Sequence, residues 1–394
     1  MIRFLRAIPL LLAVLVLGAC DTCGPDGCDS TLEISLDISH HYAFEDRGTT
    51  GYGLVETSEG NFILLGNVRT EDTLFMEDSF LEKLDSSGVS LWRKMIWSEF
   101  FTRGTSLVLC SDGGNVSVGF LRYFDNEPSD GFLVKHDDHG NRIWSSSFGD
   151  TYNDGFNSCI ESESGDLVAA GFVEEDEVTT RPWLLVTHSD GSLKWQSLPP
   201  KLLKGEAYGL SECPDGGFIV CGESGNSGFL WRVNSAGETL WFKQIFEGLG
   251  AALRDVIRVS GGDYVFTGVL MTGNNSGKLL LGRTNPEGEV RWFQALGSGF
   301  NMDVGNTLEE HPEGGFFVAG STTSFSQGDA SYWMLHFDLE GALIWDESFN
   351  LPQYSWCHSA ILSSSGGLAA IGFTTDYVNP TELWFFLTEP YTSP

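Results

Sequence analysis

A glycine-centred segment that recurs seven times is the feature that most constrains the fold of this chain. Each copy ends in a glycine that closes a short apolar run, and a second glycine stands six residues earlier. The earlier glycine predicts a tight hairpin turn, because glycine adopts a positive φ without a Cβ clash. Successive closing glycines are 46 to 53 residues apart, a spacing typical of repeated supersecondary units. The closing glycines are Gly66, Gly119, Gly171, Gly222, Gly268, Gly320 and Gly372, and the turn glycines are Gly60, Gly113, Gly165, Gly216, Gly262, Gly314 and Gly366.

The other half of each of the first six units has its own signature, in which a turn glycine is followed four residues later by a tryptophan. An apolar strand precedes each turn, as at residues 79–84. Each unit therefore predicts four antiparallel strands in about 51 residues, which is the pattern of a β-propeller blade. An indole at one position in every unit indicates packing between blades rather than a ligand platform. The pairs are Gly88/Trp92, Gly140/Trp144, Gly191/Trp195, Gly237/Trp241, Gly288/Trp292 and Gly341/Trp345.

The seventh unit lacks its fourth strand, and the other end of the chain offers a donor. Residues 32–39 alternate with the strand period of two and have no partner of their own. Pairing them with the C-terminal unit would cover two exposed sheet edges. The sequence therefore predicts an all-β fold, a seven-bladed β-propeller of four-stranded antiparallel blades, closed by an N-terminal strand that pairs with the C-terminal blade.

The predicted organisation is a signal peptide at 1–19, a lipidated cysteine and tether at 20–30, and one propeller at 31–391. The expected blades are residues 51–96, 99–149, 152–198, 206–246, 251–297, 303–349 and 354–388, the last completed by residues 31–39.

The first twenty residues predict export from the cytoplasm. A basic start and an apolar run from Ala7 to Val16 are typical of a secretory signal. The ending Leu-Gly-Ala-Cys at 17–20 resembles the lipobox of bacterial lipoproteins, which implies lipidation of Cys20. A lipid anchor in the bacterial cell envelope, facing away from the cytoplasm, is the expectation. A plain cleaved signal or an uncleaved anchor is the alternative, and the motif does not separate the inner from the outer membrane.

The remaining cysteines fall into two groups. Cys23 and Cys28 flank a turn-forming stretch, which predicts a small disulfide in an oxidising compartment, with a metal pair as the alternative. The others lie in strand-like segments and are expected to be buried small hydrophobic residues: Cys110, Cys159, Cys213, Cys221 and Cys357.

The repeats resemble a known group of propellers. The Asp/Asn-x-x-Gly-x-x-x-Trp half resembles the tryptophan-docking motif of PQQ-like, quinoprotein-type repeats. The half at 215–222 is similar to repeats of uncharacterised secreted bacterial propellers. Quinoprotein dehydrogenases generally have eight blades and a Thr before the motif glycine, so no PQQ cofactor is expected here. At that position this chain has Ser87, His139, Asp190, Ala236, Glu287 and Glu340.

The position fourteen residues before each closing glycine is predicted to line the central channel. Every residue there can form hydrogen bonds, whereas the residue two positions later is mainly apolar. Different polar side chains at one repeated position are suited to binding a ligand at the end of the channel. The alternative is that these side chains are polar only because water fills the channel. The set has no carboxylate, which argues against a glycosidase built from it. These predicted ligand-binding residues are Tyr52, Thr105, Asn157, Tyr208, Arg254, Asn306 and His358. Three tryptophans outside the repeated series are candidates for ligand stacking: Trp97, Trp231 and Trp356.

Motifs for metal sites are sparse. Asp150, Asp154, Gly155 and Glu161 have the spacing of a calcium loop, but Tyr152 occupies a ligand position. No His-Glu-x-x-His or Gly-x-Ser-x-Gly motif is present. The sequence therefore predicts no metal, no cofactor and no catalytic residue.

The charge balance bears on partners. With 22 Lys+Arg against 54 Asp+Glu the net charge is −32, which disfavours nucleic acid. The favoured function is a non-catalytic binding or assembly scaffold, a monomeric propeller that offers one face to a protein, peptide or glycan. The alternative is an enzyme with its site at the channel mouth, either a polysaccharide lyase or hydrolase or a quinoprotein-like oxidoreductase. The enzyme needs Tyr52, Tyr208, Arg254 and His358 to converge near a carboxylate.

Overall fold

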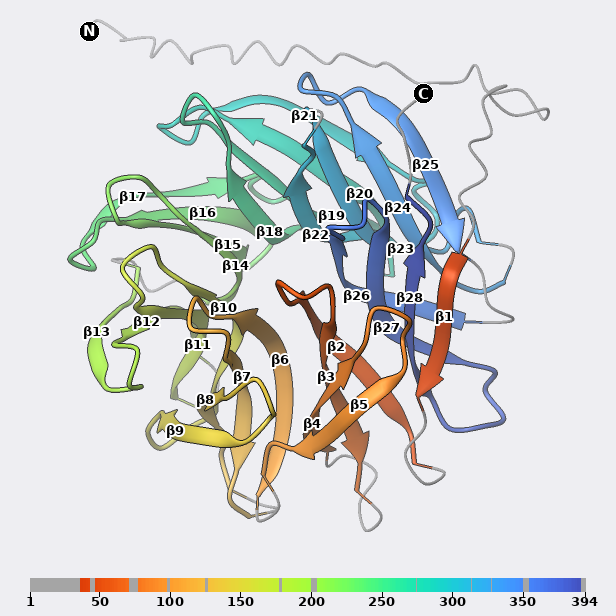
Figure 1. The fold of residues 1–394 in the computed structure, drawn as a ribbon. Coiled ribbons are helices and arrows are strands. Elements are labelled where there is room, and N and C mark those ends of the chain that lie inside the picture. Colours follow the sequence, from red (N-terminus) through yellow and green to blue (C-terminus); the bar gives the residue numbers. More distant parts are fainter. Residues whose placement is uncertain are drawn as a thin grey trace, which may run out of the picture.

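The protein is a seven-bladed β-propeller. The computed structural model describes residues 36–390 except 43–46, 71–76, 98–99, 125–126, 177–178, 200–203, 274, 313, 327 and 350–353. These residues form strands β1 to β28 and no helix, and the strands make seven four-stranded antiparallel sheets around a central axis (Figure 1). The predicted fold class is confirmed. Within the described residues no helix is long and apolar enough to cross a membrane.

Six blades are each built from one contiguous stretch of chain, with the first strand of the blade innermost. Blade 1 is β2 (Thr49–Glu56), β3 (Phe62–Arg69), β4 (Glu77–Leu84) and β5 (Ser90–Met95). Blade 2 is β6 (Phe101–Leu109), β7 (Asn115–Arg122), β8 (Asp130–His136) and β9 (Arg142–Phe148). Blade 3 is β10 (Asp154–Glu161), β11 (Leu167–Asp176), β12 (Thr179–Thr187) and β13 (Leu193–Ser197). Blade 4 is β14 (Gly205–Glu212), β15 (Phe218–Ser224), β16 (Ser227–Val233) and β17 (Thr239–Ile245). Blade 5 is β18 (Ala251–Arg258), β19 (Tyr264–Gly273), β20 (Ser276–Thr284) and β21 (Val290–Leu296). Blade 6 is β22 (Asp303–Glu310), β23 (Phe316–Thr322), β24 (Ser331–Phe337) and β25 (Leu343–Phe349).

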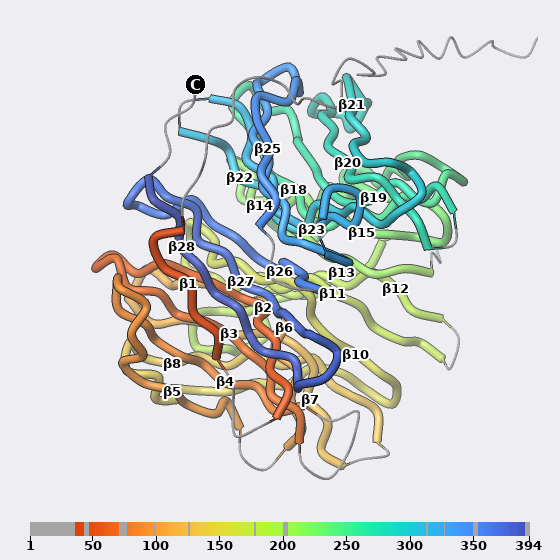
Figure 2. The backbone as a smooth tube through the Cα atoms, turned by 90° about the vertical axis from the view of Figure 1, so that its right-hand side faces the viewer, coloured from red at the N-terminus to blue at the C-terminus, as the bar shows by residue number. Residues whose placement is uncertain are grey.

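Blade 7 is assembled from both ends of the chain. It contains β26 (Tyr354–Leu362), β27 (Leu368–Thr375) and β28 (Glu382–Thr388), and its outer strand is β1 (Leu36–Tyr42). Figure 2 shows β1 beside β28, with which it pairs antiparallel from Leu36 opposite Thr388 to Tyr42 opposite Leu383. The closure is as predicted, and the described strand extends to Tyr42, three residues beyond the predicted end at residue 39. Residues 31–35 lie outside the described part of the chain.

The turn glycines of both signatures adopt the conformation that the sequence predicts. All seven hairpin glycines have a positive φ, from 70° at Gly216 to 98° at Gly314. The six glycines of the tryptophan signature have a positive φ between 75° and 84°. Side chains are strained at such angles, which is why glycine recurs at these turns.

The core lies between the blades. Ile63, Leu65 and Leu81 of blade 1 pack against Phe132 and Val134 of blade 2, and similar clusters fill the other junctions. Burying a side chain of this size contributes about 1.5–3 kcal/mol, so the packed sheet faces provide most of the stability.

The repeated tryptophans connect neighbouring blades. An ideal Cβ added to the motif glycine of the next blade would lie 2.6–2.9 Å from the indole, so each ring occupies space that only glycine leaves open. This geometry supports packing between blades over a ligand platform. The docked pairs are Trp92 on Gly140, Trp144 on Gly191, Trp195 on Gly237, Trp241 on Gly288 and Trp292 on Gly341.

The five cysteines of the described residues are buried and form no disulfide, as expected for small hydrophobic residues. Cys20, Cys23 and Cys28 lie outside the described residues, so the lipidation and the disulfide remain predictions.

Candidate functional site

A β-bulge interrupts every innermost strand at the position that the sequence predicts to line the channel. In blade 2, Gly104 pairs with Gly119 and Ser106 pairs with Val118, so Thr105 is the extra residue of the bulge. A bulge bends the strand and re-aims the extra side chain. The bulged residues of the seven blades are Tyr52, Thr105, Asn157, Tyr208, Arg254, Asn306 and His358.

The bulges also explain the closing glycines. An ideal Cβ on Gly119 would lie 2.0 Å from the carbonyl oxygen of Arg103, and one on Gly372 would lie 1.9 Å from that of Trp356. The same clash with the backbone occurs in six blades, while in blade 1 the added Cβ would meet the ring of Phe80 instead. The closing glycine therefore leaves space for the bulged strand, which links the repeat signature directly to the site.

All seven bulged residues line a single cavity of about 870 Å³ at one end of the channel. Pockets of roughly 300–1,000 Å³ are the usual size for small-molecule sites. The structure thus brings the predicted residues together, although ligand binding by them is still a prediction.

Tyr52 and His358 form the first of two polar clusters in this cavity, together with Arg103. The Tyr52 and His358 rings lie 4.4 Å apart between centroids, and Arg103 Nη2 donates a 2.8 Å hydrogen bond to the Tyr52 hydroxyl. Glu77 lies 3.6 Å from Arg103 Nε. Burial, with a smaller effect from the charge of Arg103, lowers the pKa of His358 to about 3. The imidazole is therefore neutral at physiological pH.

Tyr208, Arg254 and Glu223 form the second polar cluster, on blades 4 and 5. The Tyr208 hydroxyl donates a 3.0 Å hydrogen bond to Glu223 Oε1, and the Arg254 guanidinium lies 4.2 Å from the Tyr208 ring centroid. Glu206 is the cross-strand partner of Glu223. Burial and the nearby charge of Glu223 raise the pKa of Glu206, and burial raises the pKa of Tyr208.

The other three bulged residues tie adjacent blades together. Thr105 Oγ1 donates to the carbonyl of Phe156 at 2.6 Å, Asn157 Nδ2 to Ala207 at 3.0 Å, and Asn306 Nδ2 to Cys357 at 2.7 Å. The innermost strand of a blade is a sheet edge, so its carbonyls need partners from outside the sheet. The polarity of these three side chains therefore has a structural cause.

The sequence analysis missed several residues that shape the cavity. Arg103 and Trp356 stand sixteen residues before their closing glycines, and Glu223 directly follows one. Side chains two positions apart on a strand share a face, so the period of two could have identified Arg103 and Trp356. The bulged residues include no carboxylate, but Glu223 lines the cavity, so one acidic group is present where a glycosidase needs two. Met271, Met302 and Trp356 border an apolar side of the cavity.

The three candidate stacking tryptophans have different environments. Trp231 is fully buried, and Trp97 packs edge-on against Phe132 at 5.5 Å. Trp356 alone of the three lines the cavity, and Tyr354 stacks behind it with centroids 6.0 Å apart and planes 7° apart.

The calcium-like spacing does not form a ligand set. Asp154 Oδ2 accepts a hydrogen bond from the Asp150 amide at 2.8 Å, and burial raises the pKa of Asp154 to about 6. Glu161 lies at the far end of β10, where it accepts a 2.6 Å hydrogen bond from the Ser111 amide of blade 2. Both acids therefore act as local structural acceptors.

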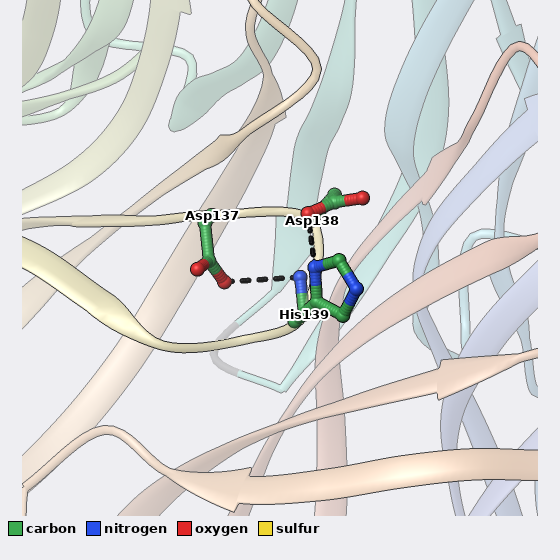
Figure 3. Close-up of side chains that lie close together, drawn as sticks. All are labelled: Asp137, Asp138 and His139. Carbon is green, nitrogen blue, oxygen red and sulfur yellow. Dashed lines mark hydrogen bonds and ion pairs between the residues drawn. The ribbon is translucent and has the colours of Figure 1, made fainter.

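Asp137, Asp138 and His139 bring three side chains of metal-ligating types together on an outer turn of blade 2 (Figure 3). Asp137 accepts hydrogen bonds from the amides of His139 and Asn141 at 3.0 and 2.7 Å, and its hydrogen bonds lower its pKa, those from Asn141 most strongly. Asp338 has the same role in blade 6, where it accepts the amide of Ala342. The position of Asp137 is thus explained by the turn alone.

Comparison with known proteins identifies the fold. No family model matches the chain, and no curated protein is similar in sequence. Among solved structures, a protein of unknown function from Dyadobacter fermentans is 11% identical with a TM-score of 0.55, covering 91% of this chain and 99% of its own. A catalytically inactive virginiamycin B lyase from Staphylococcus aureus, in complex with quinupristin, is 10% identical with a TM-score of 0.55, covering 89% and 99%. The polysaccharide lyase Uly1 is 9% identical with a TM-score of 0.53, covering 91% and 100%. These similarities establish a shared propeller architecture.

Proposed function

We propose that this protein is a lipid-anchored, extracytoplasmic binding protein that takes a saccharide into the cavity at the mouth of its channel. The observation that carries the proposal is the convergence of all seven bulged side chains on one cavity of about 870 Å³. The anchor rests on the lipobox-like residues 17–20.

The lining has the two kinds of group that a sugar requires. Trp356 offers a flat indole on the apolar side, and aromatic faces pack against the apolar face of a sugar ring. Arg103, Arg254 and Glu223 offer charged donors and acceptors for hydroxyl groups. A protein partner would instead favour a broad exposed surface, whereas these residues line a hollow.

Calorimetric titration of the full-length protein in detergent against neutral and acidic oligosaccharides tests this function. We expect saturable binding that Trp356→Ala weakens at least tenfold. The matched control is Trp97→Ala, which removes an indole that does not line the cavity. Binding that survives Trp356→Ala, or no binding of any saccharide, would contradict the proposal.

A second candidate is an enzyme acting on the same saccharide, and the contact between Tyr208 and Glu223 favours it. Tyr52, Tyr208, Arg254 and His358 line one cavity with a carboxylate, which is the arrangement that the enzyme alternative needs. Two propellers of similar architecture are lyases.

Product analysis separates binding from turnover. Cleavage would release shorter oligosaccharides, and Tyr208→Phe would abolish that release while the saccharide still binds. Intact saccharide after long incubation with the wild-type protein would leave the binding function alone.

A further inference from the structure

We infer that the ligand of this cavity is an acidic saccharide, a sugar whose ring carries a carboxylate or sulfate group that pairs with Arg254. This inference rests on the proposed function and narrows its ligand class.

Arg254 is a cavity cation that forms no ion pair with any residue that the structure describes. No carboxylate oxygen of those residues lies within 4.0 Å of its guanidinium nitrogens. By contrast, Arg93 pairs with Glu82 at 2.7 Å, Arg232 with Asp215 at 2.5 Å and Arg283 with Asp263 at 2.8 Å. The chain has 54 acidic residues against 22 basic ones, so acidic partners for arginine are abundant. The position of Arg254 in the cavity lining therefore leaves its charge available to a ligand.

The contact with Tyr208 leaves the guanidinium ready to bind. Arg254 Cζ lies over the Tyr208 ring, 4.2 Å from its centroid, and this cation–π contact does not pair the guanidinium N–H groups with an anion. A guanidinium edge matches a carboxylate or sulfate with two parallel hydrogen bonds. Tyr208 is itself held by its hydrogen bond to Glu223. The position of the guanidinium is therefore restrained before a ligand arrives.

Neither of the two nearby acidic residues, Glu206 and Glu223, forms an ion pair with Arg254 in the described part of the chain. Burial and the charge of Glu223 raise the pKa of Glu206, against the smaller lowering effects of Asn157 and Arg254. Glu223 accepts a hydrogen bond from the Tyr208 hydroxyl, so one of its carboxylate oxygens already has a partner. Arg103, the other cavity arginine, already has Glu77 and the Tyr52 hydroxyl as partners. Arg254 is consequently the cation best placed to pair with a ligand anion.

The neighbouring blades complete a site for a sugar ring. Arg254 belongs to blade 5 and Trp356 to blade 7, and Met302 and Asn306 line the cavity from the blade between them. A ring packed on the indole would have the apolar side of the cavity beneath it and the guanidinium toward blade 5. A neutral sugar would use the indole but leave the cation unpaired.

Titration calorimetry of the full-length protein in detergent tests the inference with β-linked oligosaccharides of glucose, glucuronate and glucose 6-sulfate. These probes share one ring and differ in the group at one carbon. We expect an acidic probe to bind at least tenfold more tightly than the glucose oligosaccharide. Arg254→Gln should abolish this preference, because it weakens binding of the acidic probe at least tenfold more than binding of the glucose oligosaccharide, while Arg254→Lys should retain part of the preference. The glucuronate and sulfate arms identify which anion the site prefers.

Arg291→Gln is the matched control, because it removes the same charge from the outer strand of blade 5, where Arg291 pairs with Asp263. Equal affinity for acidic and neutral probes, or an acidic preference that survives Arg254→Gln, would overturn the inference and leave saccharide binding intact. Failure of every probe to bind would overturn the proposed function itself.

Discussion

Blade 4 and blade 7 have the same four-stranded sheet but are connected to the next blade in different ways. Blade 4 is contiguous, and its Trp241 lies over Gly288 of blade 5. Blade 7 receives its outer strand from the other end of the chain, and that strand has no tryptophan. Ile38 and His40 of β1 lie over Gly88 of blade 1, where an ideal Cβ would be 2.7 and 2.6 Å from them. Tyr42 adds a 2.8 Å hydrogen bond to the carbonyl of Gly88.

The difference shows what the junction requires. A turn glycine with positive φ presents an open backbone surface, and any set of side chains that covers it can connect two blades. Three smaller side chains replace one indole at the closure. Their contact depends on the pairing of two distant segments, so the same strand pairing both closes the ring and completes blade 7.

The largest expected effect comes from removing the closing strand. Deletion of residues 36–42 would expose the edge of β28 and leave Gly88 uncovered. We expect the cooperative thermal transition to be lost, since an open sheet edge and unburied Leu383 and Phe385 remain. Circular dichroism melting measures this loss. Deletion of residues 21–30 is the control, and an unchanged transition after removal of β1 would refute the closure.

A methyl group at a closing glycine should have the next largest effect. Gly372→Ala in blade 7 would place Cβ 1.9 Å from a backbone oxygen, so we expect a loss of about 3 kcal/mol or more in the free energy of unfolding. Gly66→Ala in blade 1 would meet the Phe80 side chain at 2.4 Å, which can move, and should cost about 1–3 kcal/mol. Urea denaturation compares the two. Equal losses of unfolding free energy in the two variants would mean that a clash with the backbone is not the reason why glycine occupies this position.

Truncation of the docking side chains tests the two junctions directly. Trp241→Ala should lower the free energy of unfolding by about 3 kcal/mol, the lower end for a tryptophan because the ring is half-buried. His40→Ala should lower it by about 1 kcal/mol, because Ile38 and Tyr42 keep part of the contact. Urea denaturation provides both values. A larger loss for His40→Ala would show that the closure depends on one side chain after all.

The smallest expected effect is a pH dependence where blade 6 meets blade 7. Glu309 Oε2 accepts the Leu362 amide of blade 7 at 2.9 Å, and burial raises the pKa of this carboxyl to about 7. The folded state binds the proton of this carboxyl more tightly than the unfolded state, in which the pKa of glutamate is about 4.3. The stabilisation is therefore complete below about pH 4.3 and is lost as the pH rises through about 7. The melting temperature should therefore fall between pH 5 and pH 8.

Glu309→Gln should make that fall shallower, because glutamine does not titrate and can still accept the Leu362 amide. Glu310→Gln is the matched control, an exposed neighbour that removes the same charge. A slope that is the same in both variants would assign the pH dependence to the net charge of the whole protein. Differential scanning calorimetry at several pH values gives the slopes.

The sequence predicted the propeller fold more completely than it predicted the contacts at the candidate site. Glycine and tryptophan recur because backbone geometry restricts those positions to one residue type, so blade number and the channel-facing residues could be read from spacing. The closing strand was placed less accurately. Its alternation marks Leu36 and Ile38 alike, yet Leu36 is 40% exposed and Ile38 is buried, because pairing with β28 determines which residues face inward.

What the sequence by itself determined is the sevenfold repeat, the closure from both ends and the seven residues of the bulges. Only the tertiary structure decided what each of those residues does. Thr105, Asn157 and Asn306 are engaged by carbonyls of neighbouring blades, whereas Arg254 lies over Tyr208 and forms no ion pair within the described part of the chain. The physical reason is that spacing along a strand specifies the backbone position from which a side chain projects. The groups that the side chain contacts belong to another blade, about fifty residues away in the sequence.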